Sequence, residues 1–327
     1  MYIEHVDPAS PDRRIIAIAA DLIRAGRLVA FPTETVYGLG ANALDASAVE
    51  RIYRAKGRPA YNPLIVHVAD AAHAHDVVAH WTEAAEVLAA KFWPGPLTLV
   101  LPKRPGVPHN VTAGLPNVAV RVPSHPIAHA LLAVAALPVA APSANRSTQV
   151  SPTTGAHVAK SLGDAVDLIL DGGPTTVGIE STVVDVSSGV PTLLRPGTIS
   201  LPQLEAAVGE VRLPEKLSGA AARPSPGMLD KHYAPRARVA LVDSAEVDDV
   251  IRRERSAGQK VGAIAMRATV ADESIVLPGE ALGYAAGLYD ALHSLDDAGC
   301  DVIVIERVPA DAAWMGVADR LRRAATP

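Results

Sequence analysis

The hydrophobic pattern of residues 1–212 predicts many short strands and helices rather than a few long ones. Apolar residues at helical spacing predict helices over 11–26, 45–54, 82–92 and 126–136. Short apolar runs predict strands over 28–31, 64–68, 97–101, 118–122, 138–141, 168–170, 182–186 and 192–194. Because these strands and helices interleave irregularly, we expect a mixed α/β sheet rather than a strict βαβ repeat.

The pattern becomes regular near the end of the chain. Strands are predicted over 239–243, 261–266 and 302–305, and helices over 246–257, 279–297 and 310–325. This alternation predicts a small parallel α/β domain of the Rossmann-like type. No glycine-rich phosphate loop follows its first strand, so we assign no nucleotide to this domain.

The segment between these two regions carries Pro, Gly, Ser and Ala without hydrophobic periodicity, which is typical of a linker. It is too long for a simple connection inside one compact domain, and this favours a functional role. We therefore expect a first domain over 1–212, a linker over 213–237 and a second domain over 238–327.

Composition narrows the function classes. A chain of 327 residues suggests two domains, and net charge −5 with 4% aromatic residues argues against a nonspecific nucleic-acid binder. The single cysteine, Cys300, excludes a disulfide framework and a cysteine-based zinc site. The most apolar run, 130–141, is too short to span a membrane, and no secretory signal is visible, so we expect a soluble cytoplasmic protein.

Charge is distributed unevenly along the chain. Residues 1–237 contain 20 Lys+Arg and 20 Asp+Glu, whereas residues 238–327 contain 10 and 15. The whole acidic excess therefore lies in the predicted second domain. The global charge argues little against an anionic ligand bound by the first domain.

Three features of the first domain are candidates for binding an anion. Four cations fall within 51–58, which suits a polyphosphate but also suits a solvated helix end. The segment 142–145, Pro-Ser-Ala-Asn, follows a predicted strand, where it can meet a ligand or form an ordinary turn. Arg121 and Arg195 lie in or beside apolar strands, and each needs a ligand anion or a structural carboxylate as partner.

Two weaker patterns carry no assignment. Residues 38–43 match the permissive G-x-G-x-x-G/A pattern, but no ribose-binding acid follows at the expected distance. Four histidines lie between 67 and 80, and no pair has the spacing of a helical metal site. Among them only His67 lies in an apolar strand.

Several motifs occur in order along the first domain and together resemble the YrdC family, the threonylcarbamoyl-AMP synthases. They are Thr33-Glu-Thr-Val-Tyr-Gly-Leu39, Lys56-Gly-Arg58, Asn62-Pro-Leu64, Trp93-Pro-Gly-Pro-Leu-Thr98, Val120-Arg121, Pro142-Ser-Ala-Asn145 and Ser181-Thr-Val183. Ser225-Pro-Gly-Met228 with His232-Tyr-Ala-Pro235, followed by an α/β domain, resembles the long two-domain form of that family.

The resemblance implies a twisted mixed sheet with a concave cationic cavity, plus a Rossmann-like C-terminal domain. It implies that ATP, L-threonine and bicarbonate are converted to threonylcarbamoyl-adenylate and pyrophosphate. A tRNA threonylcarbamoyl-transferase would consume the product downstream. Mg²⁺ would arrive with the ATP phosphates, since no carboxylate cluster marks a dedicated metal site. A weak RNA contact is left open, and no membrane contact is expected.

The resemblance also assigns residues. Threonine would be held by Thr35, His67, Arg121, Ser181 and the Ala141 backbone. ATP would be held by Lys56, Arg58, Asn62, Ser143, Asn145, Ser151 and Arg195, with Tyr233 folding over the nucleotide. Asn117 is included in the ATP set, although the family usually has a small hydroxyl residue at that position. The catalytic set would be Lys56, Arg58, Ser143 and Asn145.

Three other functions compete with this assignment. An RNA-binding or ribosome-maturation module without catalysis is disfavoured by the acidic charge and the few aromatic residues. A carbamoyltransferase of the hydrogenase-maturation type would carry acylphosphatase and zinc-finger segments, which this sequence lacks. A second catalyst in the C-terminal domain lacks any catalytic constellation, so a docking or regulatory role is expected there.

Overall fold

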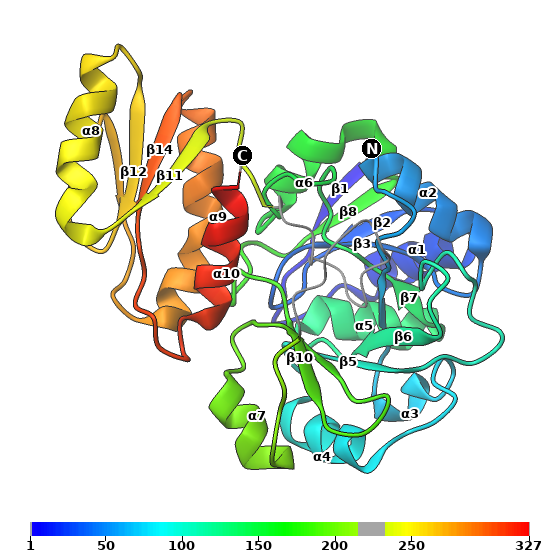
Figure 1. Cartoon of the computed structure of the whole chain (residues 1–327). Helices are drawn as coiled ribbons and strands as arrows, with labels where there is room; N and C mark the ends of the chain where they lie inside the picture. Colours follow the sequence, from blue (N-terminus) through cyan, green and yellow to red (C-terminus); the bar gives the residue numbers. More distant parts are fainter. Residues whose placement is uncertain (1, 215–232, 327) are drawn as a thin grey trace.

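The computed structural model describes residues 2–214 and 233–326, and most of the predicted linker lies outside these ranges. The described residues form two bodies, each built on its own sheet (Figure 1). In spatial order the larger sheet contains β1 (Tyr2–His5), β8 (Leu168–Asp171), β2 (Val29–Phe31), β3 (Gly38–Asn42), β7 (Val139–Ala140), β4 (Ile65–His67), β6 (Asn117–Arg121), β5 (Leu97–Pro102), β9 (Thr182–Asp185) and β10 (Thr192–Arg195).

Strand directions in this sheet are mixed, which confirms the predicted fold class. The pairs β1–β8, β2–β8, β4–β6 and β5–β9 are parallel. The pairs β2–β3, β3–β7, β4–β7, β5–β6 and β9–β10 are antiparallel. Parallel β4 and β6 end side by side, with His67 opposite Arg121, so both side chains reach the same edge of the sheet.

Helices cover the larger sheet and begin where the sequence supplies capping side chains. Asp12 and Asp45 each accept hydrogen bonds from the first turn of the helix that follows. The apolar face of the first helix, including Ile16 and Ile23, is buried against a core that contains Val29 and Phe31. The helices of this body are α1 (Arg13–Arg24), α2 (Ala46–Lys56), α3 (Ala71–Ala74), α4 (Glu83–Phe92), α5 (Pro126–Ala135), α6 (Gly155–Leu162) and α7 (Leu201–Val208), with a 3₁₀ turn η1 (Gly163–Ala165).

The structure contains elements that the hydrophobic pattern did not predict. Strand β1 is exposed at every position, and strand β3 is built largely of small residues, so neither shows a strand-like pattern. At Gly40 an added Cβ would approach the Phe31 ring to 2.7 Å. The glycines at 38–43 therefore serve close packing within a sheet. Helices α3, α6 and α7 were also not predicted.

The smaller sheet is entirely parallel in its described strands, as the Rossmann-like prediction required. Its spatial order is β11 (Arg238–Val242), β14 (Val302–Glu306), β12 (Val261–Ala265) and β13 (Glu273–Val276). Of these, only β13 was not predicted. Its helices are α8 (Val247–Ser256), α9 (Ala281–Asp297) and α10 (Met315–Ala324), with a 3₁₀ turn η2 (Ser244–Glu246).

The two bodies share a buried apolar interface. Figure 1 shows α9 and α10 between the smaller sheet and the larger body, whereas α8 covers the opposite face of the smaller sheet. Val36 and Ile179 of the larger body belong to the same core cluster as Tyr284, Leu288 and Trp314. Within the described ranges, no helix is both long and apolar enough to cross a bilayer.

Candidate active site

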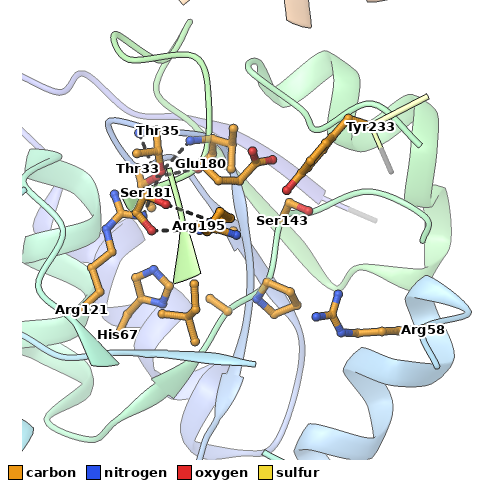
Figure 2. A pocket seen from close by; sticks show the side chains of 15 residues that line it. Thr33, Thr35, Arg58, His67, Arg121, Ser143, Glu180, Ser181, Arg195 and Tyr233 are labelled. Atoms are coloured by element: carbon orange, nitrogen blue, oxygen red, sulfur yellow. Dashed lines mark hydrogen bonds between the residues drawn. The ribbon is translucent and has the colours of Figure 1, made fainter. Parts of the chain in front are cut away.

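A pocket lies where several strands of the larger sheet end (Figure 2). Nine residues that the sequence assigned to threonine or ATP line it. These are Thr35, Arg58, His67, Arg121, Ala141, Ser143, Ser181, Arg195 and Tyr233. In Figure 2 the pocket has two ends, with Arg121 and His67 at one and Arg58 with Tyr233 at the other. The two ends of the pocket therefore present different side chains.

The first end is built around Arg121, whose buried guanidinium makes two hydrogen bonds and one ion pair. Its Nη1 donates to Thr35 Oγ1 at 2.9 Å, and its Nε donates to Gly95 O at 3.2 Å. Its Nη2 lies 2.7 Å from Glu34 Oε1, and both side chains are less than a tenth exposed. Glu34 also accepts a hydrogen bond from Ser124 N at 3.1 Å. Arg121 thus has a structural carboxylate as partner while it faces the pocket.

His67 lies beside Arg121 and is buried at the end of β4. Burial, together with the charge of Arg121, lowers the pKa of His67 to about 3. The imidazole is therefore neutral at physiological pH. It can hydrogen-bond a ligand at this end without adding a positive charge.

Ser181 and Arg195 form the middle of the pocket wall. Arg195 donates from Nε to Ser181 O and from Nη2 to Ser181 Oγ, both at 3.0 Å. The Ser181 hydroxyl also lies 2.8 Å from Thr98 Oγ1. These contacts join β10, β5 and the start of β9, so the Arg195 guanidinium is fixed by the sheet itself.

At the second end, the Lys56–Arg58 motif begins at the last residue of helix α2, and Gly57 caps the helix with φ 60°. Arg58 donates from Nε to Asn62 O at 3.0 Å and from Nη2 to Pro63 O at 2.7 Å. Lys56 does not line the pocket. Its Nζ donates to the carbonyls of Ser143 and Asn145, each at 2.5 Å.

The Lys56 ammonium is almost inaccessible to solvent. Burial and the nearby charge of Arg58 lower the pKa of Lys56 well below its usual value. Through these two carbonyl contacts the Lys56 side chain holds the Pro142–Asn145 segment against α2, and this segment presents Ser143 to the pocket.

Four other predicted residues also lie outside the pocket lining. Asn62 and Asn145 are buried behind it, and Asn62 Nδ2 and Asn145 Oδ1 have no hydrogen-bond partner in the described part of the chain. Ser151 Oγ donates to Glu180 Oε1 at 2.5 Å. Asn117 Nδ2 donates to Ser187 Oγ at 3.0 Å, so its side chain is engaged away from the pocket.

Sequence reasoning missed three polar residues at the site. Thr33 Oγ1 lies 2.8 Å from Thr35 Oγ1 and lines the pocket beside it. Glu34 pairs with Arg121, and the position of Arg121 in an apolar strand did predict such a partner. Glu180 lines the pocket next to Ser181, and only its place beside that motif could have drawn attention to it.

The residues do not form a resident Mg²⁺ site. Among the described residues, no group of three His, Cys, Asp or Glu side chains could hold a metal ion. Glu180 is the single carboxylate among the described lining residues, and its oxygens accept from Ser151, Tyr289 and Arg320.

Comparisons with known proteins agree with this geometry. The Sua5_yciO_yrdC family profile, described as "Telomere recombination", matches residues 21–197, and the profile "Threonylcarbamoyl-AMP synthase, C-terminal domain" matches residues 199–326. The chain is 46% identical to the threonylcarbamoyl-AMP synthase of Pyrococcus abyssi over 94% of this chain and 93% of that protein. It is 43% identical to the Bacillus subtilis threonylcarbamoyl-AMP synthase over 99% of this chain and 96% of that protein.

A solved structure extends the likeness to three dimensions. The crystal structure of P. abyssi Sua5 complexed with L-threonine covers 99% of this chain and 98% of its own, at 44% identity and a TM-score of 0.95. The similarity therefore includes both bodies and their arrangement.

Proposed function

This chain belongs to the Sua5/YrdC family of threonylcarbamoyl-AMP synthases, and from that premise we propose that it makes threonylcarbamoyl-adenylate and pyrophosphate from L-threonine, bicarbonate and ATP. The observation that carries the proposal is one pocket with two ends, each lined by residues suited to one substrate. Full-length similarity to synthases favours this catalytic role over an RNA-binding module without catalysis.

Threonine is assigned to the end formed by Arg121, His67 and Thr35. A guanidinium is suited to a carboxylate, and Thr35 already holds Nη1 of Arg121 in place. The Ser181 hydroxyl and the Ala141 backbone complete this end. Because Glu34 neutralises Arg121 in the structure, the threonine carboxylate either displaces Glu34 or shares the guanidinium with it.

ATP is assigned to the end formed by Arg58, Ser143 and Tyr233, with Arg195 between the two substrates. Arg58 and Arg195 both line the pocket and supply two guanidinium groups, which suits a polyphosphate. Lys56 and Asn62 would act indirectly. Lys56 donates to the carbonyls of Ser143 and Asn145, and the Asn62 carbonyl accepts from the Arg58 side chain. We propose that Asn145 and Ser151 act in the same indirect way, and we assign no nucleotide contact to the Asn117 side chain.

The reaction needs positioning and charge neutralisation more than a covalent nucleophile. The threonine amine attacks CO₂ derived from bicarbonate, with loss of water, and forms a carbamate. A carbamate oxygen then attacks the α-phosphorus of ATP, and pyrophosphate leaves with the electron pair of the broken P–O bond. Arg58 and Arg195 would stabilise the negative charge on the phosphates. Tyr233 would exclude water, which would hydrolyse the carbamate and the mixed anhydride.

Further elements of the proposal concern the surroundings of the enzyme. Mg²⁺ would enter bound to the ATP phosphates, consistent with the lack of a metal cluster among the described residues. A tRNA threonylcarbamoyl-transferase would use the product, and we propose that the enzyme works in the cytoplasm beside it. Any direct RNA contact would be weak. We propose a catalytic domain over 1–212, a linker over 213–237 and a second domain over 238–327.

The test is release of pyrophosphate by the purified chain. Release that requires ATP, threonine and bicarbonate together, and that prefers threonine over serine, supports the proposal. Arg58→Ala should abolish this release in a protein that remains folded by circular dichroism. Near-normal turnover by folded Arg58→Ala would refute the assigned site. Salt-dependent tRNA binding without any ATP turnover would favour the RNA-binding alternative.

A further inference from the structure

Glu180 is a buried carboxylate in the wall of the pocket, and two of its hydrogen-bond donors come from the second body. Its Oε2 accepts from Tyr289 OH of α9 at 2.9 Å and from Arg320 Nε of α10 at 2.8 Å. Its Oε1 accepts from Ser151 Oγ of the larger body at 2.5 Å. The Arg320 side chain is 0% exposed and that of Glu180 is 9% exposed, so water contributes little to this contact.

The same guanidinium touches the backbone on both sides of the pocket wall. Arg320 Nη1 donates to Pro196 O at 2.9 Å, directly after Arg195. Its Nη2 donates to Glu180 O at 3.2 Å, directly before Ser181. The guanidinium carbon lies 5.3 Å from the centre of the Tyr233 ring, a cation–π distance. One side chain of the second body thus contacts the segments that carry Ser181, Arg195 and Tyr233.

Close backbone packing fixes the helices that carry this arginine. At Gly178 an added Cβ would lie 2.3 Å from Ala285 O in α9, and at Gly316 in α10 it would lie 2.5 Å from Gly197 O. Neither position has room for a side chain, so both helices lie directly against the segments that contain Glu180 and Arg195. The placement of Arg320 is therefore set by the interface independently of its ion pair.

The contact between Glu180 and Arg320 joins two opposite charges. Burial opposes ionisation of Glu180, but Arg320, Arg195 and the Ser151 hydroxyl more than offset it and lower the pKa of Glu180 to about 2. The carboxylate is therefore ionised at neutral pH and needs its cationic partner, since a buried charge without one is strongly unfavourable. Glu180 and Arg195 both lie in the pocket wall, so loss of Arg320 would change the local charge balance within the site.

We propose that Arg320 is a positioning residue of the synthase site, through which the second body holds Glu180, Arg195 and Tyr233 in the geometry that ATP requires. This inference rests on the proposed function and gives the C-terminal domain a role inside the catalytic centre. None of the hydrogen bonds or ion pairs described for Arg320 involves Arg121, His67 or Thr35. Its contact nearest the threonine end is Glu180 O, beside Ser181, whose hydroxyl is also held by Thr98 and Arg195. Loss of Arg320 should therefore weaken ATP binding more than threonine binding.

The experiment compares full-length Arg320→Met, Arg320→Lys and a control, Arg252→Met. Arg252 is an exposed arginine on α8, where it pairs with the exposed Asp249. Pyrophosphate release gives kcat and the two KM values, and calorimetry gives ATP and threonine affinities without turnover. Arg320→Met should lower kcat/KM for ATP by roughly 10-fold to 100-fold. The threonine KM should change by less than about threefold, a distinction that general destabilisation would not produce.

The other variants separate positioning from folding. Arg320→Lys should recover part of the activity, because an ammonium keeps the charge beside Glu180 but cannot reach Pro196 O and Glu180 O together. Arg252→Met should remain within about twofold of the wild type, since its pair is exposed. If Arg320→Met does not fold, Arg320→Met combined with Glu180→Gln removes the uncompensated buried charge and serves as the test variant, with the same expected loss for ATP.

Wild-type ATP kinetics in a folded Arg320→Met chain, or in the folded double variant, would overturn the inference. Equal losses for ATP and threonine would also contradict it. A wild-type chain that releases no pyrophosphate would refute the proposed function instead, and the calorimetric comparison would still test whether Arg320 controls nucleotide affinity.

Discussion

The buried pair of Arg121 and Glu34 allows folding and substrate binding to be measured separately. The two charged atoms lie 2.7 Å apart, and the side chains are 4% and 7% exposed. At an effective dielectric constant of about 20, the direct attraction at this distance is roughly 6 kcal/mol, much of which is offset by desolvation. Arg121→Met leaves Glu34 as a buried charge without its cation, which costs about 3–5 kcal/mol of the free energy of unfolding.

This loss should lower the melting temperature by roughly 10 °C. Arg121→Met combined with Glu34→Gln removes both charges, so we expect stability to return to within about 2 kcal/mol of the wild type. The threonine KM should stay raised by roughly 10-fold to 100-fold in both variants, because the carboxylate ligand is gone in each. The ATP KM should change little.

The assay is thermal unfolding followed by circular dichroism, combined with pyrophosphate release at varied threonine and varied ATP. Two results would refute the reasoning. If the double variant is as unstable as Arg121→Met, the buried charge is not the source of the loss. If the ATP KM rises more than the threonine KM, the division of the pocket into two substrate ends is wrong.

Three further predictions follow from other buried groups. Lys56→Met removes the donor to two carbonyls of the Ser143 segment, so the ATP KM should rise at least about 10-fold with little change for threonine; Arg54→Met, at an exposed position two residues earlier, is the kinetic control. Tyr233→Ala should lower the amount of threonylcarbamoyl-AMP recovered per pyrophosphate released, because water that reaches the mixed anhydride converts it to AMP; chromatography measures this ratio, and an unchanged ratio would contradict the water-excluding role. The folded pKa of Glu180 is about 2 and its usual value is 4.5, so its stabilising contribution is complete above about pH 4.5 and is lost as the pH falls toward 2. In urea unfolding, the stability difference between wild type and Glu180→Gln should therefore narrow over that pH range, and a constant difference would be inconsistent with it.

The hydrophobic pattern predicted the central strands of both sheets, because a strand that is buried on both faces is a continuous run of apolar residues. The run 97–101 is an example: β5 spans Leu97–Pro102, and its first five residues are buried. Strand β3 has no such signal, because close packing against Phe31 requires glycine where a strand usually has a β-branched residue. The exposed edge strand β1 shows no alternation for the opposite reason, since none of its residues is buried.

The candidate site was predictable where a motif places its chemistry in adjacent residues, as in 56–58 and 143–145. The structure also changes what such motifs mean: Lys56 holds a backbone segment, whereas Arg58 faces the pocket. Glu180 had no local signature, because the group that makes it important is Arg320, 140 residues away in the sequence. Contacts between the two bodies depend on tertiary packing, which periodicity along the chain does not encode.

The identity of the product is tested most directly by isotopic labelling. The wild-type chain is incubated with ATP, threonine and ¹³C-labelled bicarbonate, and the adenylate fraction is analysed by mass spectrometry. We expect threonylcarbamoyl-AMP that carries a single ¹³C in its carbamoyl carbon, with pyrophosphate formed in equal amount. An adenylate without the label, or ATP consumed with no threonine-containing product, would contradict it.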